Sequence, residues 1–213
     1  MPRVRVHQHV NPLAPYFRFT PKPLEIDKIF ADPKLPLYLD IGSARGRFLL
    51  KMAEIEKDRN FLGVEIREPL VEEANRIASE KALTNLHFEF CNAMMALEKL
   101  TEKFPEDRLQ TVTIQFPDPW FKKKHAKRRM VNAELVTCVA GHLAAGGRIF
   151  VQTDIEFLAE EMFELFAQNS DLRAIDVSEN PFPIKTEREK AVEEKGCAIY
   201  RRIFEKNSQN PER

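Results

Sequence analysis

The stretch that decides the fold is Leu37-Tyr38-Leu39-Asp40-Ile41-Gly42-Ser43-Ala44-Arg45-Gly46. Its first five residues are mainly apolar and predict a buried strand. The two glycines that follow are typical of a tight turn, where the backbone tolerates positive φ and can approach a ligand closely. A helix over 46–57 then completes a strand–turn–helix unit, with which Rossmann-like α/β sheets begin.

The same alternation of strand and helix continues along the chain. We predict further strands over 61–65, 86–90, 110–116 and 148–153, and helices over 68–82, over 93–103, from Leu135 to the Gly146-Gly147 pair, and over 155–168. Two late strands, 172–177 and 197–204, are separated by a polar loop with no obvious helix. The sequence therefore predicts a doubly wound, mostly parallel sheet with an antiparallel final strand.

A length of 213 residues suits one domain with a substantial core. Residues 1–35 are rich in proline and predict an N-terminal arm with one short helix near 24–30. In this arm Arg3 and Arg5 would either extend a basic surface or belong to an unstructured tail. Residues 36–206 would form the domain, and 207–213 a C-terminal tail.

Composition excludes several classes of protein. The 33 Lys and Arg balance the 33 Asp and Glu, so net charge does not indicate a partner. Cys91, Cys138 and Cys197 form no CxxC motif, which argues for reduced, mostly buried thiols and against a disulfide or zinc framework. The sequence shows no signal peptide and no apolar run of membrane-spanning length, so we expect a cytoplasmic protein without membrane or metal partners. Monomer and homodimer both stay open.

Acidic and amide side chains follow the first three strands. Glu65 closes the second strand 23 residues after Gly42, the spacing at which a carboxylate accepts hydrogen bonds from both ribose hydroxyls of an adenosine cofactor. Asn92 follows the third strand, where its amide would face adenine. Asp40 would repel a pyrophosphate but suits the ammonium of a methionine moiety, so the turn favours S-adenosyl-L-methionine over a nicotinamide cofactor. The alternative is that Asp40 and Glu65 are merely solvated strand ends.

A second segment carries the chemistry. Phe116-Pro117-Asp118-Pro119-Trp120-Phe121 follows the predicted fourth strand, and six Lys and Arg occupy the next eight residues, 122–129. Asp118 should stand at the carboxyl end of that strand, where open α/β sheets bind ligands. The basic strip would meet the phosphates of a nucleic acid. Trp120 would stack on a base or anchor its loop, whereas Phe121 is expected to pack.

With these motifs the chain resembles the bacterial tRNA (guanine-N7-)-methyltransferase family over most of its length. The resemblance is carried by Asp40-Ile41-Gly42, Gly63-Val64-Glu65, the Phe116–Trp120 segment with Lys122-Lys123 and Lys127-Arg128-Arg129, Thr153-Asp154, and Thr186-Glu187-Arg188-Glu189. It implies methyl transfer from S-adenosyl-L-methionine to a guanosine of the tRNA variable loop, nucleotide 46 of tRNA. The chain departs from the family at Ala44, where a glycine is usual, at Asp40, where Glu is frequent, and at Asn92, where Asp is frequent.

The resemblance and the chemistry together give an expected site. N7 of guanine is already a nucleophile, so catalysis consists mainly of positioning and electrostatics. We expect Asp118 to stabilise the charge that grows on the purine and to border the cofactor, with Asp154 assisting. Lys122 would lie against the target nucleotide. The resemblance implies that Thr186, Glu187, Arg188 and Glu189 close over the guanosine, with Thr186 and Glu189 in contact with it.

Other functions stay open from the sequence alone. A methyltransferase that acts on a protein or a small molecule would share the cofactor motifs. A catalytically silent RNA-binding module would share the basic strip, although Asp40, Glu65 and Asp118 favour an enzyme. A nicotinamide-dependent dehydrogenase fits the turn sequence least well.

Overall fold

The computed structural model describes residues 9–208, so Arg3 and Arg5 lie outside the described part of the chain. Two short 3-10 helices, η1 (Pro15–Phe17) and η2 (Ile26–Lys28), lie in the N-terminal arm. The domain follows as β1 (Leu37–Ile41), α1 (Arg47–Ile55), β2 (Asn60–Glu65), α2 (Glu68–Glu80), β3 (Leu86–Phe90), α3 (Ala93–Thr101), β4 (Leu109–Gln115), η3 (Lys123–Arg128), α4 (Ala133–His142), β5 (Leu143–Thr153), α5 (Glu156–Ala167), β6 (Leu172–Asp176), α6 (Glu187–Glu194) and β7 (Tyr200–Lys206).

These strands form one sheet in the order β3-β2-β1-β4-β5-β7-β6. The first five strands are parallel, and β7 runs antiparallel between β5 and β6, which confirms the predicted fold class. Because β1 lies between β2 and β4, the chain reverses its direction of winding beside β1. Ligands of doubly wound sheets bind at such a reversal, at the carboxyl ends of the strands.

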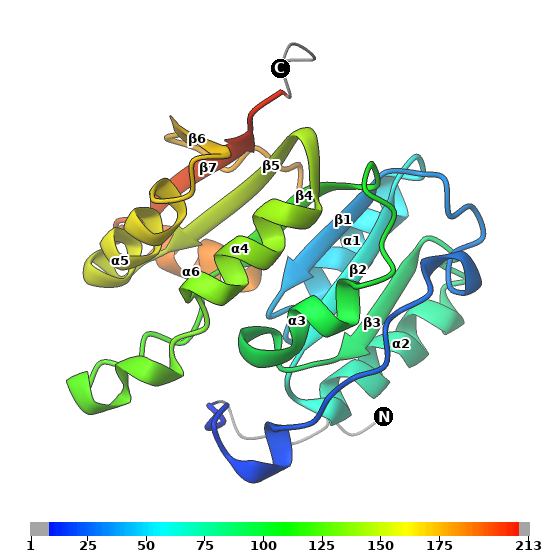
Figure 1. Cartoon of the computed structure of the whole chain (residues 1–213), viewed down its shortest axis with the longest axis horizontal. Coiled ribbons are helices and arrows are strands. Elements are labelled where there is room, and N and C mark those ends of the chain that lie inside the picture. Colours follow the sequence, from blue (N-terminus) through cyan, green and yellow to red (C-terminus); the bar gives the residue numbers. More distant parts are fainter. Residues whose placement is uncertain (1–8, 209–213) are drawn as a thin grey trace.

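Helices cover both faces of the sheet (Figure 1). One apolar cluster joins α1 and α2 to the sheet and includes Phe48, Met52 and Phe88. The other joins α3, α4 and α5 to the opposite face and includes Leu97, Val139 and Phe166. Burial on both faces explains why the central strands read as continuous apolar runs in the sequence.

Two predictions about the second half of the chain were wrong. The helix α4 ends at His142 instead of continuing to Gly146, because Leu143 already has extended backbone, with φ −64° and ψ 131°, and begins β5. Gly146, inside β5, has a left-handed φ of +72°. A Cβ on Gly147 would lie 2.8 Å from the carbonyl oxygen of Ala144, so this tight connection needs glycine there too. The register of β4 against β5 accordingly jumps from Leu143 to Arg148.

The second error is the polar loop before β7, which contains the helix α6. The helix α6 is nearly all polar, so it lacks the apolar periodicity on which helix prediction rests. Its start is nevertheless encoded, since the Thr186 side chain accepts a hydrogen bond from the Glu189 amide at 3.1 Å. This is the first half of a capping box, a Thr followed three residues later by Glu.

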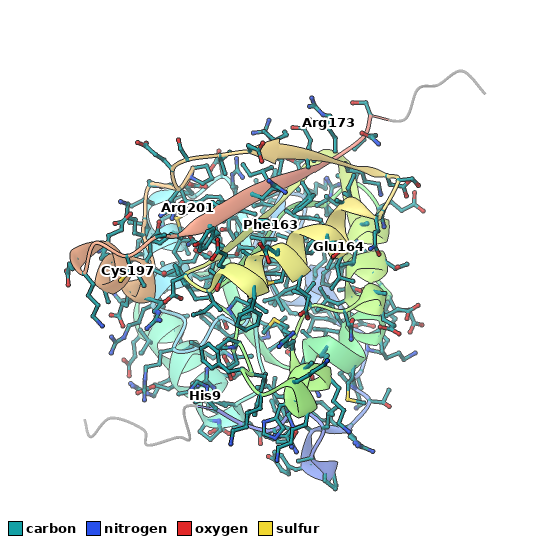
Figure 2. All side chains as sticks on the ribbon, turned by 90° about the vertical axis from the view of Figure 1, so that its left-hand side faces the viewer. His9, Phe163, Glu164, Arg173, Cys197 and Arg201 are labelled. Carbon is teal, nitrogen blue, oxygen red and sulfur yellow. The ribbon has the colours of Figure 1, made fainter. Side chains whose placement is uncertain are left out.

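The three cysteines are free, as expected, but only Cys91 is fully buried. Cys138 is half-buried, and Cys197 is exposed where the chain passes from α6 to β7 (Figure 2). Across residues 9–208, no helix has both the length and the apolar character needed to cross a membrane.

Candidate active site

The carboxyl ends of the parallel strands bring the predicted residues to one edge of the sheet. Ile41 of β1 lies level with Val64 of β2 and Ile114 of β4, and Gln115 of β4 lies opposite Gln152 of β5. The polar residues that follow these positions are therefore neighbours. In Figure 1 the segment between β4 and α4, in green, extends outward from the body of the domain.

The turn after β1 is built from left-handed backbone. Gly42 has a φ of +86°, and Ala44 has a φ of +50° although it carries a Cβ. A left-handed alanine costs roughly 1–2 kcal/mol relative to its usual conformation. The Ala44 amide donates a hydrogen bond of 2.8 Å to Oε2 of Glu65, which links the turn to the end of β2. The turn thus retains a shape suited to glycine at the position where this chain has alanine.

Asp40 lies below this turn and is only 5% exposed. Its Oδ1 accepts a hydrogen bond of 2.6 Å from the Thr113 hydroxyl on the neighbouring strand. Burial raises the pKa of Asp40 to about 6, and the charge of Glu65 adds to this, while the Thr113 hydrogen bond and the nearby Gln115 amide oppose it. A buried acid of this kind favours a positively charged ligand, because a cation would restore the ionised form.

Glu65 is buried at the end of β2, and both of its carboxylate oxygens accept hydrogen bonds. The Arg67 amide and Nε donate to Oε1 at 3.0 and 2.8 Å, and Arg67 Nη2 donates to Oε2 at 3.0 Å. Burial lowers the pKa of Arg67, but the hydrogen bonds and charge of Glu65, with the charge of Asp118, outweigh it and raise that pKa. Arg67 is therefore the direct partner of Glu65 and also feels the charge of Asp118, which the sequence did not indicate.

The Asn92 side chain binds the N-terminal arm, whereas the sequence predicted that its amide would face adenine. The side chain is 2% exposed, and its Nδ2 donates to the carbonyl oxygens of Pro12 at 2.9 Å and Phe17 at 3.2 Å. Both acceptors belong to the N-terminal arm, so Asn92 holds the arm against the end of β3.

Asp118 stands on a strained loop after β4. Phe116 and Trp120, two residues before and after it, have φ values of +52° and +43°. Bulky residues rarely adopt this region, and such strain clusters at functional sites. The Asp118 side chain is 41% exposed, and its Oδ1 lies 2.7 Å from His9 Nδ1 of the arm. The carboxylate is thus accessible, and the contact with His9 is a second feature that the sequence did not reveal.

The basic strip that follows divides into two groups. Lys122, Lys123, Lys124 and Lys127 are exposed. The two arginines instead hold the loop together. The guanidinium of Arg128 lies 4.9 Å from the Trp120 ring centroid, and Arg129 pairs with Glu161 and donates to the Pro119 carbonyl at 3.1 Å.

The lysines create a strongly positive surface. Burial, followed by the charges of Arg128, Lys124 and Lys122, lowers the pKa of His125 within the same loop. No counter-ion for these lysines is seen among the ion pairs of residues 9–208. The strip is therefore suited to a polyanion.

The helix α6 lies beside the end of β5. Arg188 pairs with Asp154, and Glu187 pairs with Arg47 at the start of α1, with 2.6 Å between Arg47 Nη1 and Glu187 Oε2. Thr186 caps the helix. The segment predicted to close over the guanosine thus bridges the start of α1 and the end of β5.

Glu189, the last residue of that segment, is completely buried. Its carboxylate accepts hydrogen bonds from Gln152 at 3.2 Å, Asn180 at 2.6 Å and Arg201 at 2.9 Å. Arg201 reaches it from β7, where Figure 2 labels this side chain. The antiparallel pairing places Arg201 opposite Gln152, so this buried ion pair depends on a register that the sequence did not disclose.

Within residues 9–208 no cluster of three or more His, Cys, Asp or Glu side chains is arranged to hold a metal ion.

Comparison with known proteins identifies the family of this chain. A family model described as "Putative methyltransferase" matches residues 34–202. The chain is 51% identical over 212 residues to the tRNA (guanine-N(7)-)-methyltransferase of Trichormus variabilis, which covers 98% of this chain and 99% of that protein. It is 50% identical over 207 residues to the enzyme of the same name from Synechococcus elongatus, covering 96% of this chain and 97% of that one.

Solved structures show the same fold. An rRNA methylase from Streptococcus thermophilus superposes with a TM-score of 0.52 at 9% identity, covering 86% of this chain and 92% of that one. The aminoglycoside resistance methyltransferase NpmB1 gives a TM-score of 0.53 at 16% identity, covering 85% and 90%. At such identities the likeness establishes the Rossmann-like methyltransferase fold and nothing about the substrate.

Proposed function

The chain belongs to the tRNA (guanine-N7-)-methyltransferase family, and from this premise we propose that it transfers a methyl group from S-adenosyl-L-methionine to N7 of a guanosine in the tRNA variable loop. The observation that carries the proposal is the shared edge of the sheet. There a buried acid, an accessible carboxylate on a strained loop and a run of exposed lysines follow neighbouring parallel strands.

The residues around the turn fit the cofactor. Gly42 has a left-handed φ of +86°, and a Cβ there would lie 3.0 Å from the terminal methyl of Met130, so glycine suits both the backbone and the space of this turn. The Ser43 hydroxyl is buried and has no hydrogen-bond partner within residues 9–208. Asp40 would pair with the ammonium of the methionine moiety. Glu65 would accept hydrogen bonds from the ribose hydroxyls after the Arg67 guanidinium moves away from its carboxylate. Asn92 would act indirectly, by holding the N-terminal arm against the end of β3.

When bound, the cofactor supplies an electrophilic methyl group on a sulfonium. The guanine N7 attacks with a lone pair that needs no prior deprotonation, so no general base is required. As the methyl group transfers, positive charge grows on the purine. Asp118 would stabilise that charge and accept hydrogen bonds from the N1–H and N2–H edge, while the strained backbone at Phe116 and Trp120 fixes its position.

The remaining residues would hold the target nucleotide. Lys122 directly follows the strained loop and would lie against the nucleotide, with Lys123, Lys124 and Lys127 on neighbouring phosphates. Asp154, Thr186, Glu187 and Arg188 would close the opposite side, because α6 reaches both the cofactor turn and β5. Glu189 would support α6 through its buried hydrogen bonds, since its burial prevents the predicted contact with the guanosine.

The experiment combines methyl transfer with calorimetry. Wild-type protein incubated with methyl-labelled cofactor and an unmodified tRNA transcript should produce 7-methylguanosine. Asp118→Asn keeps the shape but removes the charge, so turnover should fall on the order of 10²-fold while cofactor binding stays measurable by titration calorimetry.

Asp107→Asn is the matched control, because Asp107 is 71% exposed at the opposite end of β4. It should leave turnover unchanged. Wild-type rates in Asp118→Asn would refute the role of Asp118. Methylation that does not require tRNA would refute the substrate.

A further inference from the structure

The most exposed large apolar side chain among the described residues lies at the base of the basic strip. Phe121 is 67% exposed. Its ring meets the half-exposed Phe157 edge to face, with 5.9 Å between the ring centroids. Phe157 lies in the first turn of α5, three residues after Asp154, so the aromatic pair borders the candidate active site.

The loop backbone directs Trp120 inward and Phe121 outward. The φ of +43° at Trp120 turns that residue back onto its own loop, where Arg128 covers its ring and His125 meets it edge on at 5.7 Å. For Trp120 these contacts agree with the alternative that it anchors its loop, whereas Phe121 does not pack as expected. Trp120 serves the packing of the loop, and Phe121 offers its ring to solvent.

Phe121 is also held in place. Its partner Phe157 carries the guanidinium of Arg129 on its ring, at 5.0 Å from the centroid. Arg129 in turn pairs with Glu161 and donates to the carbonyl of Pro119. A fixed aromatic ring loses little freedom when a ligand stacks on it.

We propose that Phe121 is a stacking platform for an unpaired nucleobase of tRNA beside the target guanosine. The proposal rests on the proposed function and extends it to a residue without an assigned role. Lys122, Lys123 and Lys124 follow Phe121 directly and are exposed, so the ring sits within a surface complementary to a phosphate backbone. Aromatic rings flanked by cations bind single-stranded nucleic acids in this way, because every base has a π face.

The test separates stacking from charge by its salt dependence. Binding of an unmodified tRNA transcript is measured by filter binding over a series of salt concentrations for the wild type, Phe121→Ala, Phe121→Tyr and Lys123→Ala. Phe121→Ala should weaken binding roughly 5- to 150-fold at every salt concentration, with the wild-type slope of log affinity against log salt. Phe121→Tyr keeps the ring and should stay within about twofold of the wild type.

Lys123→Ala should instead reduce the slope by about 0.7–0.9, so its effect shrinks as salt rises. Unfolding midpoints of the variants verify that each one is folded. Equal binding by Phe121→Ala and the wild type, or a loss shared by Phe121→Tyr, would overturn the platform while leaving the proposed function intact. A wild type that binds no tRNA would overturn both.

Discussion

Replacing Asp40 with Asn should make the protein more stable and abolish its affinity for the cofactor. Asn has the shape of Asp, and its Oδ1 can still accept the hydrogen bond from Thr113. The substitution removes only the negative charge that the buried Asp40 side chain, at 5% exposure, carries when it ionises. The folded protein therefore no longer bears the free-energy cost of a buried negative charge.

The magnitude follows from the pKa of Asp40, which burial raises from 3.8 to about 6. Between these values the folded chain binds a proton that the unfolded chain has released, so stability falls as pH rises from about 4 to about 6. A difference of about 2 pKa units corresponds to about 3 kcal/mol at most. Above pH 6 the Asn variant should be more stable by up to that amount, and near pH 4 the two proteins should be equal.

Urea denaturation of both proteins at several pH values measures this difference, with Asp107→Asn as the control for loss of an exposed charge. Titration calorimetry then measures the affinity of both proteins for the cofactor. The Asn variant should lose this affinity, because the ammonium of the cofactor no longer has a counter-charge. In the wild type, affinity should fall about tenfold per pH unit below pH 6. A stability difference that does not depend on pH, or a variant that binds the cofactor as the wild type does, would refute this reasoning.

Three further predictions follow from the same contacts. Ala44→Gly should raise the free energy of unfolding by about 1 kcal/mol, because Ala44 has a φ of +50°, and an unchanged urea midpoint would contradict this. Glu189→Ala should destabilise the fold by about 3–5 kcal/mol, since it leaves the Arg201 guanidinium buried without its counter-charge; a thermal midpoint near that of the wild type would show that the pair is not structural. Lys51→Ala, on the exposed side of α1, should leave the salt dependence of tRNA binding unchanged, in contrast to Lys123→Ala, and equal slopes in the two variants would argue against the basic strip as the binding surface.

The sequence predicted the parallel half of the fold well, for a clear reason. Leu37–Ile41 is buried on both faces and reads as a short apolar run, whereas the edge strand Leu86–Phe90 alternates apolar residues with His87 and Glu89, and both patterns located the strand to the residue. Glycine also marked the turn after β1. The failures lie where apolar periodicity carries little information, as in the polar helix α6, or where the backbone becomes extended within a run of apolar residues, as at Leu143.

The site was predictable in its location but not in its contacts. The sheet topology alone brings Asp40, Glu65, Asp118 and Asp154 to one edge. The partners of these residues depend on side-chain direction and strand register, which cannot be inferred from the neighbouring residues in the sequence. Arg67 on Glu65, His9 on Asp118 and Arg201 beneath Glu189 are examples. The exposure of Phe121, which was expected to pack, has the same origin, because the sequence does not reveal the left-handed backbone of the preceding Trp120.

The most direct test of the central claim is to map the methylated atom. Unmodified tRNA is treated with the protein and methyl-labelled cofactor, and the labelled nucleoside is then identified and located in the strand. The edge of carboxylates and lysines predicts 7-methylguanosine at one guanosine of the variable loop, and no label in a transcript that carries 7-deazaguanosine there. Label on another atom, another nucleotide or the protein itself would contradict the account.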